Sequence, residues 1–227
     1  MLRLDVRADI RPLVRQMTQV QKRQAPFAIA RGLTQLAQTA VVDLQGEMHR
    51  RFDKPTRFTL GAFAARPAKR GELTAYVVSR GPTAKGRAAL KYLGPEISGG
   101  PRRMKGFELK LTALAGGQFV VPARGAVLDS FGNLRRSLLK DLFASLAQPG
   151  GRKFVVAYQG HDRTKRPIGV YQLVSKGVVK PILTFLPRAP NYRARLLVDA
   201  TVTASVRRNA AQVLAKAFAD ALRTARR

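Results

Sequence analysis

The chain has 227 residues, and its 42 Lys and Arg against 13 Asp and Glu give a formal net charge of +29. Hydrophobic residues make up 45% of it, which is enough for a packed core and argues against disorder. There is no cysteine and there are only two histidines, which excludes disulfide scaffolds, thiolate zinc sites and cysteine nucleophiles. No apolar run approaches about 18 residues, and Asp5 and Asp9 interrupt the first segment, so we expect neither a membrane span nor a signal peptide.

Helical periodicity dominates the first fifty residues. The first stripe, with Pro12 suited to an opening turn, consists of Ile10, Leu13, Met17 and Val20. Pro26 is expected to break or restart the helix. The second stripe, which ends near Arg50–Arg51, consists of Phe27, Ala30, Leu33, Ala37, Val41, Leu44 and Met48. A similar pattern predicts a C-terminal helix that begins around Asn191 or later and runs towards Arg223.

Four segments have the composition of strands. The first, residues 72–80, is bounded by glycine and proline. The other three, at 153–159, 169–175 and 178–185, are separated by short connections and predict an antiparallel meander. Pro181 indicates that the last of these is an edge strand or carries a bulge.

The region between these strands is too long for a simple loop. It opens with a basic stretch rich in Gly and Pro, continues with a short strand at 117–122, and closes with a helix for which Asn133 is the expected N-cap. The apolar face of that helix is too large to leave in water, so we expect its central residues to be core or subunit interface: Leu138, Leu142, Phe143 and Leu146.

Together these elements predict an α+β fold, in which an antiparallel sheet of about four strands is packed by long N- and C-terminal helices. Residues 1–80 would supply the N-terminal helices and first strand of the core domain. Residues 81–151 would form an insertion made of the basic loop and one helix. Residues 152–227 would complete the core domain with the meander and the C-terminal helix.

No combination of residues indicates catalysis, and we predict no catalytic, cofactor or metal site and no enzyme. The glycine spacing of residues 81–88 superficially follows a phosphate-binding P-loop, but the Lys-Ser/Thr pair that this loop needs is absent. Asp43 with Glu47 is better read as a solvated helix face, paired with arginines, than as an acid–base or metal site. His161 with Asp162 has the character of an ordinary polar loop.

The positive charge is poorly compensated in two segments, residues 61–105 and 151–190, where few acids accompany the cations. Lysines and arginines in loops lie at the surface and suit contacts with DNA phosphates or with an acidic partner. A solvated surface that serves only solubility is the competing reading. The candidate contact residues are Arg80, Lys85, Arg87, Lys91, Arg102, Arg103, Lys105, Arg163, Lys165 and Arg166.

Three stretches resemble a known family. They are PTRFTL at 55–60, YLGPEI at 92–97 with GGPR at 99–102 and KGFE at 105–108, and VP at 121–122 with LD-x-FGNL at 128–134. In these stretches the chain resembles the small head–tail connector, tail-completion and minor tail proteins of tailed bacteriophages and prophages. The resemblance covers roughly the first two thirds of the chain.

This resemblance implies a structural virion protein, assembled in the host cytoplasm, that forms a homo-oligomeric ring in the neck or tail around the DNA passage. Its implied partners are further copies, other virion proteins such as portal, adaptor or tail proteins, and DNA through non-specific phosphate contacts. Neither a cofactor, nor a membrane, nor a small-molecule substrate is implied. The alternatives are a nucleic-acid-binding protein without sequence specificity and a minor structural protein associated with the capsid.

Overall fold

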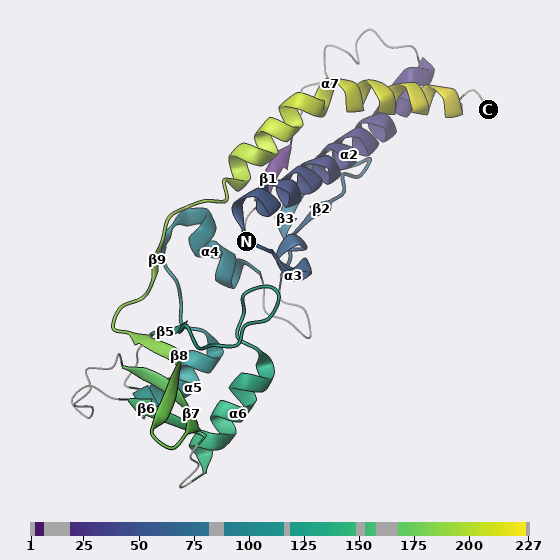
Figure 1. Ribbon diagram of the computed structural model, residues 1–227. Helices are drawn as coiled ribbons and strands as arrows, with labels where there is room; N and C mark the ends of the chain where they lie inside the picture. The colour runs from purple at the N-terminus through teal and green to yellow at the C-terminus, as the bar shows by residue number, and fades with distance from the viewer. Residues whose placement is uncertain are drawn as a thin grey trace. The chain divides into compact units, whose positions relative to one another are not determined.

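The computed structural model (Figure 1) describes residues 3–6, 19–81, 89–115, 119–148, 153–157 and 168–225. Its fold is mixed α+β with antiparallel sheets and long N- and C-terminal helices, as the sequence predicts. The chain forms two compact units. We call Met1–Ser98 with Ala194–Arg227 the helical unit, and Gly99–Arg193 the inserted unit.

Two long helices, α2 (Gln19–Arg51) and α7 (Val198–Ala225), run antiparallel along each other in the helical unit (Figure 1). The predicted stripe of α2 is buried except at Val41, which is half-buried, and at Phe27, which is exposed. Pro26 lies inside α2 and does not break it. The proline removes one backbone donor, but Ala25 and Ala28 beside it are buried, so packing holds the helix through this position.

A three-stranded antiparallel sheet completes the helical unit, in the order β1 (Arg3–Val6), β3 (Ala75–Ser79), β2 (Phe63–Arg66). Helix α2 packs against β2 and β3, and their contact is part of the main hydrophobic core. Two short helices, α3 (Arg57–Leu60) and α4 (Leu90–Ser98), border this core. The sequence predicts β3, whereas β1 and β2 lie where no strand is expected.

The inserted unit contains a four-stranded antiparallel sheet, in the order β5 (Phe119–Pro122), β8 (Val178–Leu186), β7 (Gly169–Ser175), β6 (Phe154–Ala157). The predicted meander is therefore confirmed. Strand β8 lies between β5 and β7, so Pro181 is not on an edge strand. The bulge alternative holds instead, because the pairing of β7 with β8 shifts register between Val170 and Tyr171, where Tyr171 faces Pro181.

Helices α5 (Gly106–Ala115) and α6 (Arg136–Ala147) supply the rest of the inserted unit's core. Leu142 is buried, and Leu138, Phe143 and Leu146 are half-buried against the same core. These four residues therefore pack inside this unit. The predicted N-cap is wrong, because α6 begins at Arg136, after an Arg135 that makes no side-chain capping hydrogen bond. Asn133 instead donates its backbone N–H to Asp129 within the preceding turn.

The chain enters the inserted unit after Ser98 and leaves it after Arg193. At this point β4 (Gly100–Pro101) pairs antiparallel with β9 (Asn191–Tyr192), and the Arg102 N–H donates to the Pro190 carbonyl at 3.3 Å. Gly99 and Gly100 have φ of 74° and 91°, a left-handed conformation that glycine adopts without strain. The two ends of the inserted unit therefore lie side by side.

The predicted domain boundaries differ from this division. We expected residues 81–151 to be inserted and the meander to pack under the long helices. Instead, the insertion is Gly99–Arg193 and includes the meander, because the meander shares a hydrophobic core with α5 and α6. Helix α2 covers the three-stranded sheet, and α7 packs along α2.

Candidate functional site

The described residues contain no group of three His, Cys, Asp or Glu side chains that could hold a metal ion. None of the helices that the structure describes is long and apolar enough to cross a membrane. Glu47 accepts hydrogen bonds from Arg51 and Arg50, which lower its pKa, and Asp43 pairs with Arg208 at 2.6 Å. The reading of Asp43 and Glu47 as a helix face paired with arginines is therefore confirmed.

The predicted contact cations that the structure describes are divided between the two units. Arg80, after β3, and Lys91, in α4, are exposed on the helical unit. Arg103 and Lys105 are exposed in the inserted unit, before α5. The remaining candidates except Arg102 lie outside the described residues: Lys85, Arg87, Arg163, Lys165 and Arg166.

Arg102 must be removed from the candidate contact residues, because its guanidinium is used inside the inserted unit. Its two Nη atoms donate to the carboxylate of Glu108 at 2.7 and 2.5 Å. The side chain of Arg102 is only 10% exposed and that of Glu108 is fully buried. Arg102 also donates to the Val120 carbonyl at 3.1 Å and lies over the Phe119 ring. A cation held in this way stabilises the fold and has little surface left for a partner.

Glu108 accepts two further hydrogen bonds, from the backbone N–H groups of Lys105 and Val120 at 2.5 and 3.1 Å. The hydrogen bond from Lys105 is one of the two that make up a capping box, in which the side chain of the third helical residue accepts from the backbone N–H of the residue before the helix. Here Glu108 is the third residue of α5 and Lys105 is the residue before the helix. Burial acts to raise the pKa of Glu108, but the Arg102 and backbone hydrogen bonds outweigh it, so the pKa lies below its ordinary value. The sequence signal that was missed is the spacing of Glu108 from the helix start.

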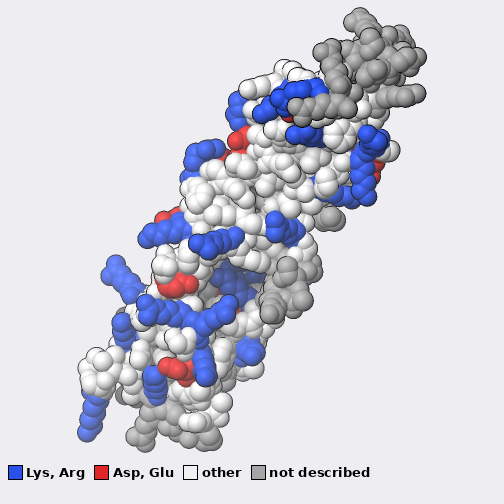
Figure 2. Space-filling view, turned by 90° about the vertical axis from the view of Figure 1, so that its right-hand side faces the viewer, with Lys and Arg blue, Asp and Glu red and all other residues white. Residues whose placement is uncertain are grey.

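The acidic residues of the described chain are mostly engaged within each unit, whereas many cations are not. On the face of the molecule that Figure 2 shows, Lys and Arg are widely spread and only a few Asp and Glu lie among them. Exposed cations such as Arg57, Lys91, Arg103, Arg124 and Arg188 have no acidic partner among the described side chains. The acids instead form the pairs Asp43–Arg208, Glu47–Arg50, Glu47–Arg51, Glu96–Arg195, Glu108–Arg102, Asp141–Lys153, Asp220–Arg31 and Asp220–Arg223. Neutralisation of the remaining cations therefore needs anions from outside the chain.

Comparison with protein-family models, curated proteins and solved structures finds no match. The function is therefore inferred from the chemistry of the described surfaces and from the resemblance in the sequence. Two further surface features bear on it, a groove along α2 and an exposed aromatic pair.

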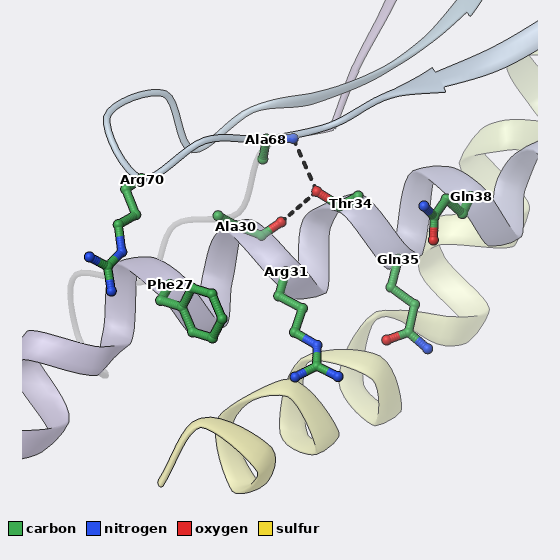
Figure 3. Close-up of a pocket in the computed structure, with 8 residues that line it drawn as sticks. All are labelled: Phe27, Ala30, Arg31, Thr34, Gln35, Gln38, Ala68 and Arg70. Atoms are coloured by element: carbon green, nitrogen blue, oxygen red, sulfur yellow. Dashed lines mark hydrogen bonds between the residues drawn. The ribbon is translucent and has the colours of Figure 1, made fainter. Parts of the chain in front are cut away.

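The groove along α2 has a volume of about 810 Å³ (Figure 3). Thr34 lines the groove, and two hydrogen bonds hold its side chain in place. The Thr34 hydroxyl donates to the Ala30 carbonyl at 2.7 Å and accepts from the Ala68 N–H at 3.1 Å. Arg70 reaches from the β2–β3 loop over the exposed ring of Phe27, while Arg31 projects from α2 towards α7. Among the described residues, its lining holds two arginines and no carboxylate, which suits an anionic or polar surface.

An exposed aromatic pair, Phe58 and Tyr92, lies between α3 and α4 with ring centroids 6.1 Å apart. The Tyr92 hydroxyl is hydrogen-bonded to the Thr59 hydroxyl at 2.9 Å, and partial burial raises the pKa of Tyr92. Arg57 and Lys91, the residues before the two aromatics, are exposed as well. An exposed aromatic surface beside cations is typical of binding surfaces. Sequence reasoning missed it, because aromatics in short helices have no periodicity that separates exposed positions from core.

Proposed function

We propose that the protein is a structural component of a tailed-bacteriophage particle. In this proposal it is a subunit of an oligomeric ring in the neck or tail, where it connects head to tail or completes the tail around the DNA passage, and it has no enzymatic role. The observation that carries the proposal is the set of exposed cations that have no acidic partner among the described side chains, where most of the acids are already engaged within their own unit.

The resemblance at residues 55–60, 92–108 and 121–134 supports the virion context. Its first two stretches include the exposed aromatic pair, Phe58 and Tyr92, and the last includes the exposed Phe131. Apolar side chains that remain exposed on ordered elements suit contacts with neighbouring subunits or with portal, adaptor and tail proteins. In a ring, each copy uses one patch to meet a different patch on the next copy.

A ring also gives the positive charge a use. Each copy has a formal net charge of +29, so several copies around a central passage concentrate positive potential where DNA travels. Such contacts with phosphate require no base-specific geometry and weaken as salt rises. An acidic neighbouring ring would use the same cations.

The decisive experiment is the assembly state of the purified full-length chain, measured by light scattering and negative-stain electron microscopy at several salt concentrations. We expect closed rings of uniform copy number. A chain that stays monomeric at every concentration yet retains duplex DNA in a gel shift would overturn this proposal. It would favour the second candidate, a nucleic-acid-binding protein without sequence specificity, which the same unpaired cations support.

The role of the exposed cations is tested by a double reversal, Arg103→Glu with Lys105→Glu, which leaves Arg102 and Glu108 in place. The matched control is Lys140→Glu with Lys176→Glu, which makes the same charge change at exposed positions of α6 and the β7–β8 turn. We expect the first variant to lose assembly or DNA retention and the control to keep both. Equal losses would show that only total charge matters, and no loss in either would remove these residues from the contact surface.

A further inference from the structure

The exposed aromatic pair of the helical unit is held in place although both of its rings reach solvent. Phe58 is 50% exposed and Tyr92 is 43% exposed. The hydroxyl groups of Tyr92, Thr59 and Thr56 form a chain in which each successive O–O distance is 2.9 Å. Thr56 is the N-cap of α3, and its hydroxyl accepts the Thr59 N–H at 3.1 Å. This chain of hydroxyls ties the Tyr92 ring of α4 to the first turn of α3.

Neighbouring leucines anchor the same two rings in the main core of the helical unit. Leu93, the residue after Tyr92, is buried, and Leu60, two residues after Phe58, packs against the same core. The ring centroids are 6.1 Å apart and the ring planes are tilted by 32°, so the two rings form one aromatic surface. Side chains that are already ordered lose little conformational entropy when a ligand binds.

The charge around the aromatic pair is positive. Residues 53–60 and 89–98 carry three exposed cations, namely Lys54, Arg57 and Lys91. The same segments hold two acids, Asp53 and Glu96. Glu96 accepts hydrogen bonds from Nε and Nη2 of Arg195 at 2.7 and 2.8 Å, so its charge is already neutralised. Asp53 alone remains against the three cations, and the surface therefore favours an anionic ligand.

Large exposed aliphatic side chains do not extend this surface within the described residues. The other large apolar side chains that are exposed on the helical unit lie on α2 or just before α7: Phe27, Val42 and Leu197. The leucines of α3 and α4 pack against the core instead. The centre of a protein–protein interface is a wider apolar area. Two rings among cations are instead the combination that binds single-stranded nucleic acid, in which bases stack on aromatics and phosphates contact Lys and Arg.

We infer that the aromatic pair binds single-stranded nucleic acid, with bases stacked on Phe58 and Tyr92 and phosphates beside Arg57 and Lys91. In a duplex the faces of each base are covered by the neighbouring base pairs, so only unpaired bases can stack on these rings. Every base has a flat face, so the contact requires no particular sequence. This inference goes beyond the ring proposed above, because it concerns unpaired bases and requires no second copy of the chain.

The binding of fluorescein-labelled oligonucleotides to the full-length chain, followed by fluorescence anisotropy, tests the inference. Three probes of equal length are compared: oligothymidylate, the same phosphodiester backbone with abasic sites, and duplex DNA. We expect oligothymidylate to bind at least about fivefold more tightly than the abasic backbone, which corresponds to one stacked base. Equal affinity for these two probes would overturn the inference.

Variants of the two rings locate the effect. Phe58→Ala with Tyr92→Ala should bind oligothymidylate no more tightly than the abasic backbone, and its affinity for duplex DNA should not change. Tyr92→Phe keeps the ring and loses only the contact with Thr59, so it should retain the preference for bases. The matched control is Phe131→Ala, which removes a ring that is 46% exposed in the inserted unit and should bind all three probes as the unchanged chain does.

The single variant Phe58→Ala keeps the test valid if the double variant unfolds more easily. It leaves the hydrogen bond of the Tyr92 hydroxyl in place and removes an exposed ring, so its denaturation midpoint should match that of the unchanged chain. We expect weaker binding of oligothymidylate and unchanged binding of the abasic backbone. An unchanged preference for bases in Phe58→Ala, or an equal loss in Phe131→Ala, would overturn the inference.

The two cations should act on both single-stranded probes alike. Arg57→Ala with Lys91→Ala removes two phosphate contacts, so the slope of log affinity against log salt should become shallower by about 1 to 1.5 for either probe. The control, Lys140→Ala with Lys176→Ala, removes the same charge from exposed positions of the inserted unit and should change the slope less. Equal slopes for the two variants would overturn the placement of phosphates beside Arg57 and Lys91.

The assembly state of the same variants separates this inference from the proposed function. Loss of rings in Phe58→Ala with an intact preference for bases would make the pair a subunit contact, which overturns this inference and leaves the ring proposal standing. A chain that stays monomeric but prefers unpaired bases would overturn the ring proposal and leave this inference standing.

Discussion

Arg102 and Glu108 form a bidentate ion pair inside the inserted unit, with N–O distances of 2.7 and 2.5 Å. The pair joins the segment after β4 to α5, and through the Val120 carbonyl and N–H it also holds β5. The Glu108 carboxylate also accepts from two backbone N–H groups, and the Nη atoms of Arg102 also donate to the Arg103 and Val120 carbonyls. Removing one partner of such a buried ion pair strongly lowers the free energy of unfolding, because the other charge remains buried without its partner.

Replacing Arg102 with alanine should lower the free energy of unfolding of the inserted unit by about 3 to 5 kcal/mol, because a buried carboxylate then lacks its cation. Arg103→Ala is the natural control, since the neighbouring side chain is exposed, and it should change stability by less than about 0.5 kcal/mol. Urea unfolding followed by circular dichroism measures both. Similar midpoints for the two variants would contradict the structural role of Arg102.

The contribution of Glu108 should depend on pH in a defined direction. Its folded-state pKa is lowered, below the ordinary value of about 4.3, so the unfolded chain binds the proton more readily. The stabilisation is therefore complete above about pH 4.3 and is lost as pH falls through the lowered value. The difference in unfolding free energy between the unchanged chain and Glu108→Gln should be constant near neutrality and shrink in acid.

The matched experiment for this pH dependence uses Asp141→Asn, which removes an exposed pair with Lys153 at 2.9 Å. Exposed pairs contribute little, so the difference from the unchanged chain should be small at every pH. Urea unfolding at pH 7, 5 and 3 provides the comparison. A Glu108→Gln difference that grew towards low pH would show that the carboxylate is destabilised by its surroundings.

Two glycines of α2 should respond oppositely to substitution. A Cβ at Gly32 would lie 2.8 Å from Leu214 Cδ2 and 3.3 Å from Ala217 Cβ, so Gly32→Leu should destabilise the α2–α7 pair by about 1 to 3 kcal/mol. At Gly46 a Cβ meets only the end of Arg50, at 3.7 Å, and Gly46→Ala should stabilise by about 0.5 to 1 kcal/mol. Thermal unfolding of both variants checks the signs, and destabilisation by Gly46→Ala would contradict this account of the helix face.

The helical unit should fold without the inserted unit. Deleting Gly99–Arg193 and joining Ser98 to Ala194 through two glycines removes a segment whose ends already pair in β4 and β9, about 5 Å apart across an antiparallel pair. We expect a helical chain with a cooperative unfolding transition. A product that binds hydrophobic dyes and unfolds without cooperativity would show that the helical unit needs the insertion.

The sequence predicted the elements in which the apolar periodicity and the flanking glycines or prolines indicate the same bounds. The bounds of β7 match the expected 169–175, and the buried stripe of α2 and the site of the β8 bulge at Pro181 are confirmed. Strand β1 was not predicted because its alternation of Leu4 and Val6 with Arg3 and Asp5 extends over only four residues, and its pairing with β3 about seventy residues away is a tertiary effect. The domain division was wrong because periodicity does not indicate which sheet a helix will cover.

The candidate site shows a similar limit. Charge counting identified Arg103 and Lys105 as exposed cations, but it treated Arg102 in the same way, although Glu108 lies only six residues further on. What distinguishes Arg102 is a carboxylate brought under it by the start of α5, together with a carbonyl from β5. Composition indicates how many cations lack acids, and only the tertiary structure shows which ones.

The discontinuity of the helical unit has a consequence for the order in which the protein folds during synthesis. Residues Gly99–Arg193 are translated between the two parts of this unit, which takes roughly 5 to 20 seconds at ordinary elongation rates. Until α7 emerges, the face of α2 that it covers, including Gly32, has no partner on the nascent chain. The inserted unit has a core of its own and can form in this interval. Helix α2 is thus synthesised long before the helix that completes its packing, and its α7-facing side stays uncovered throughout that interval.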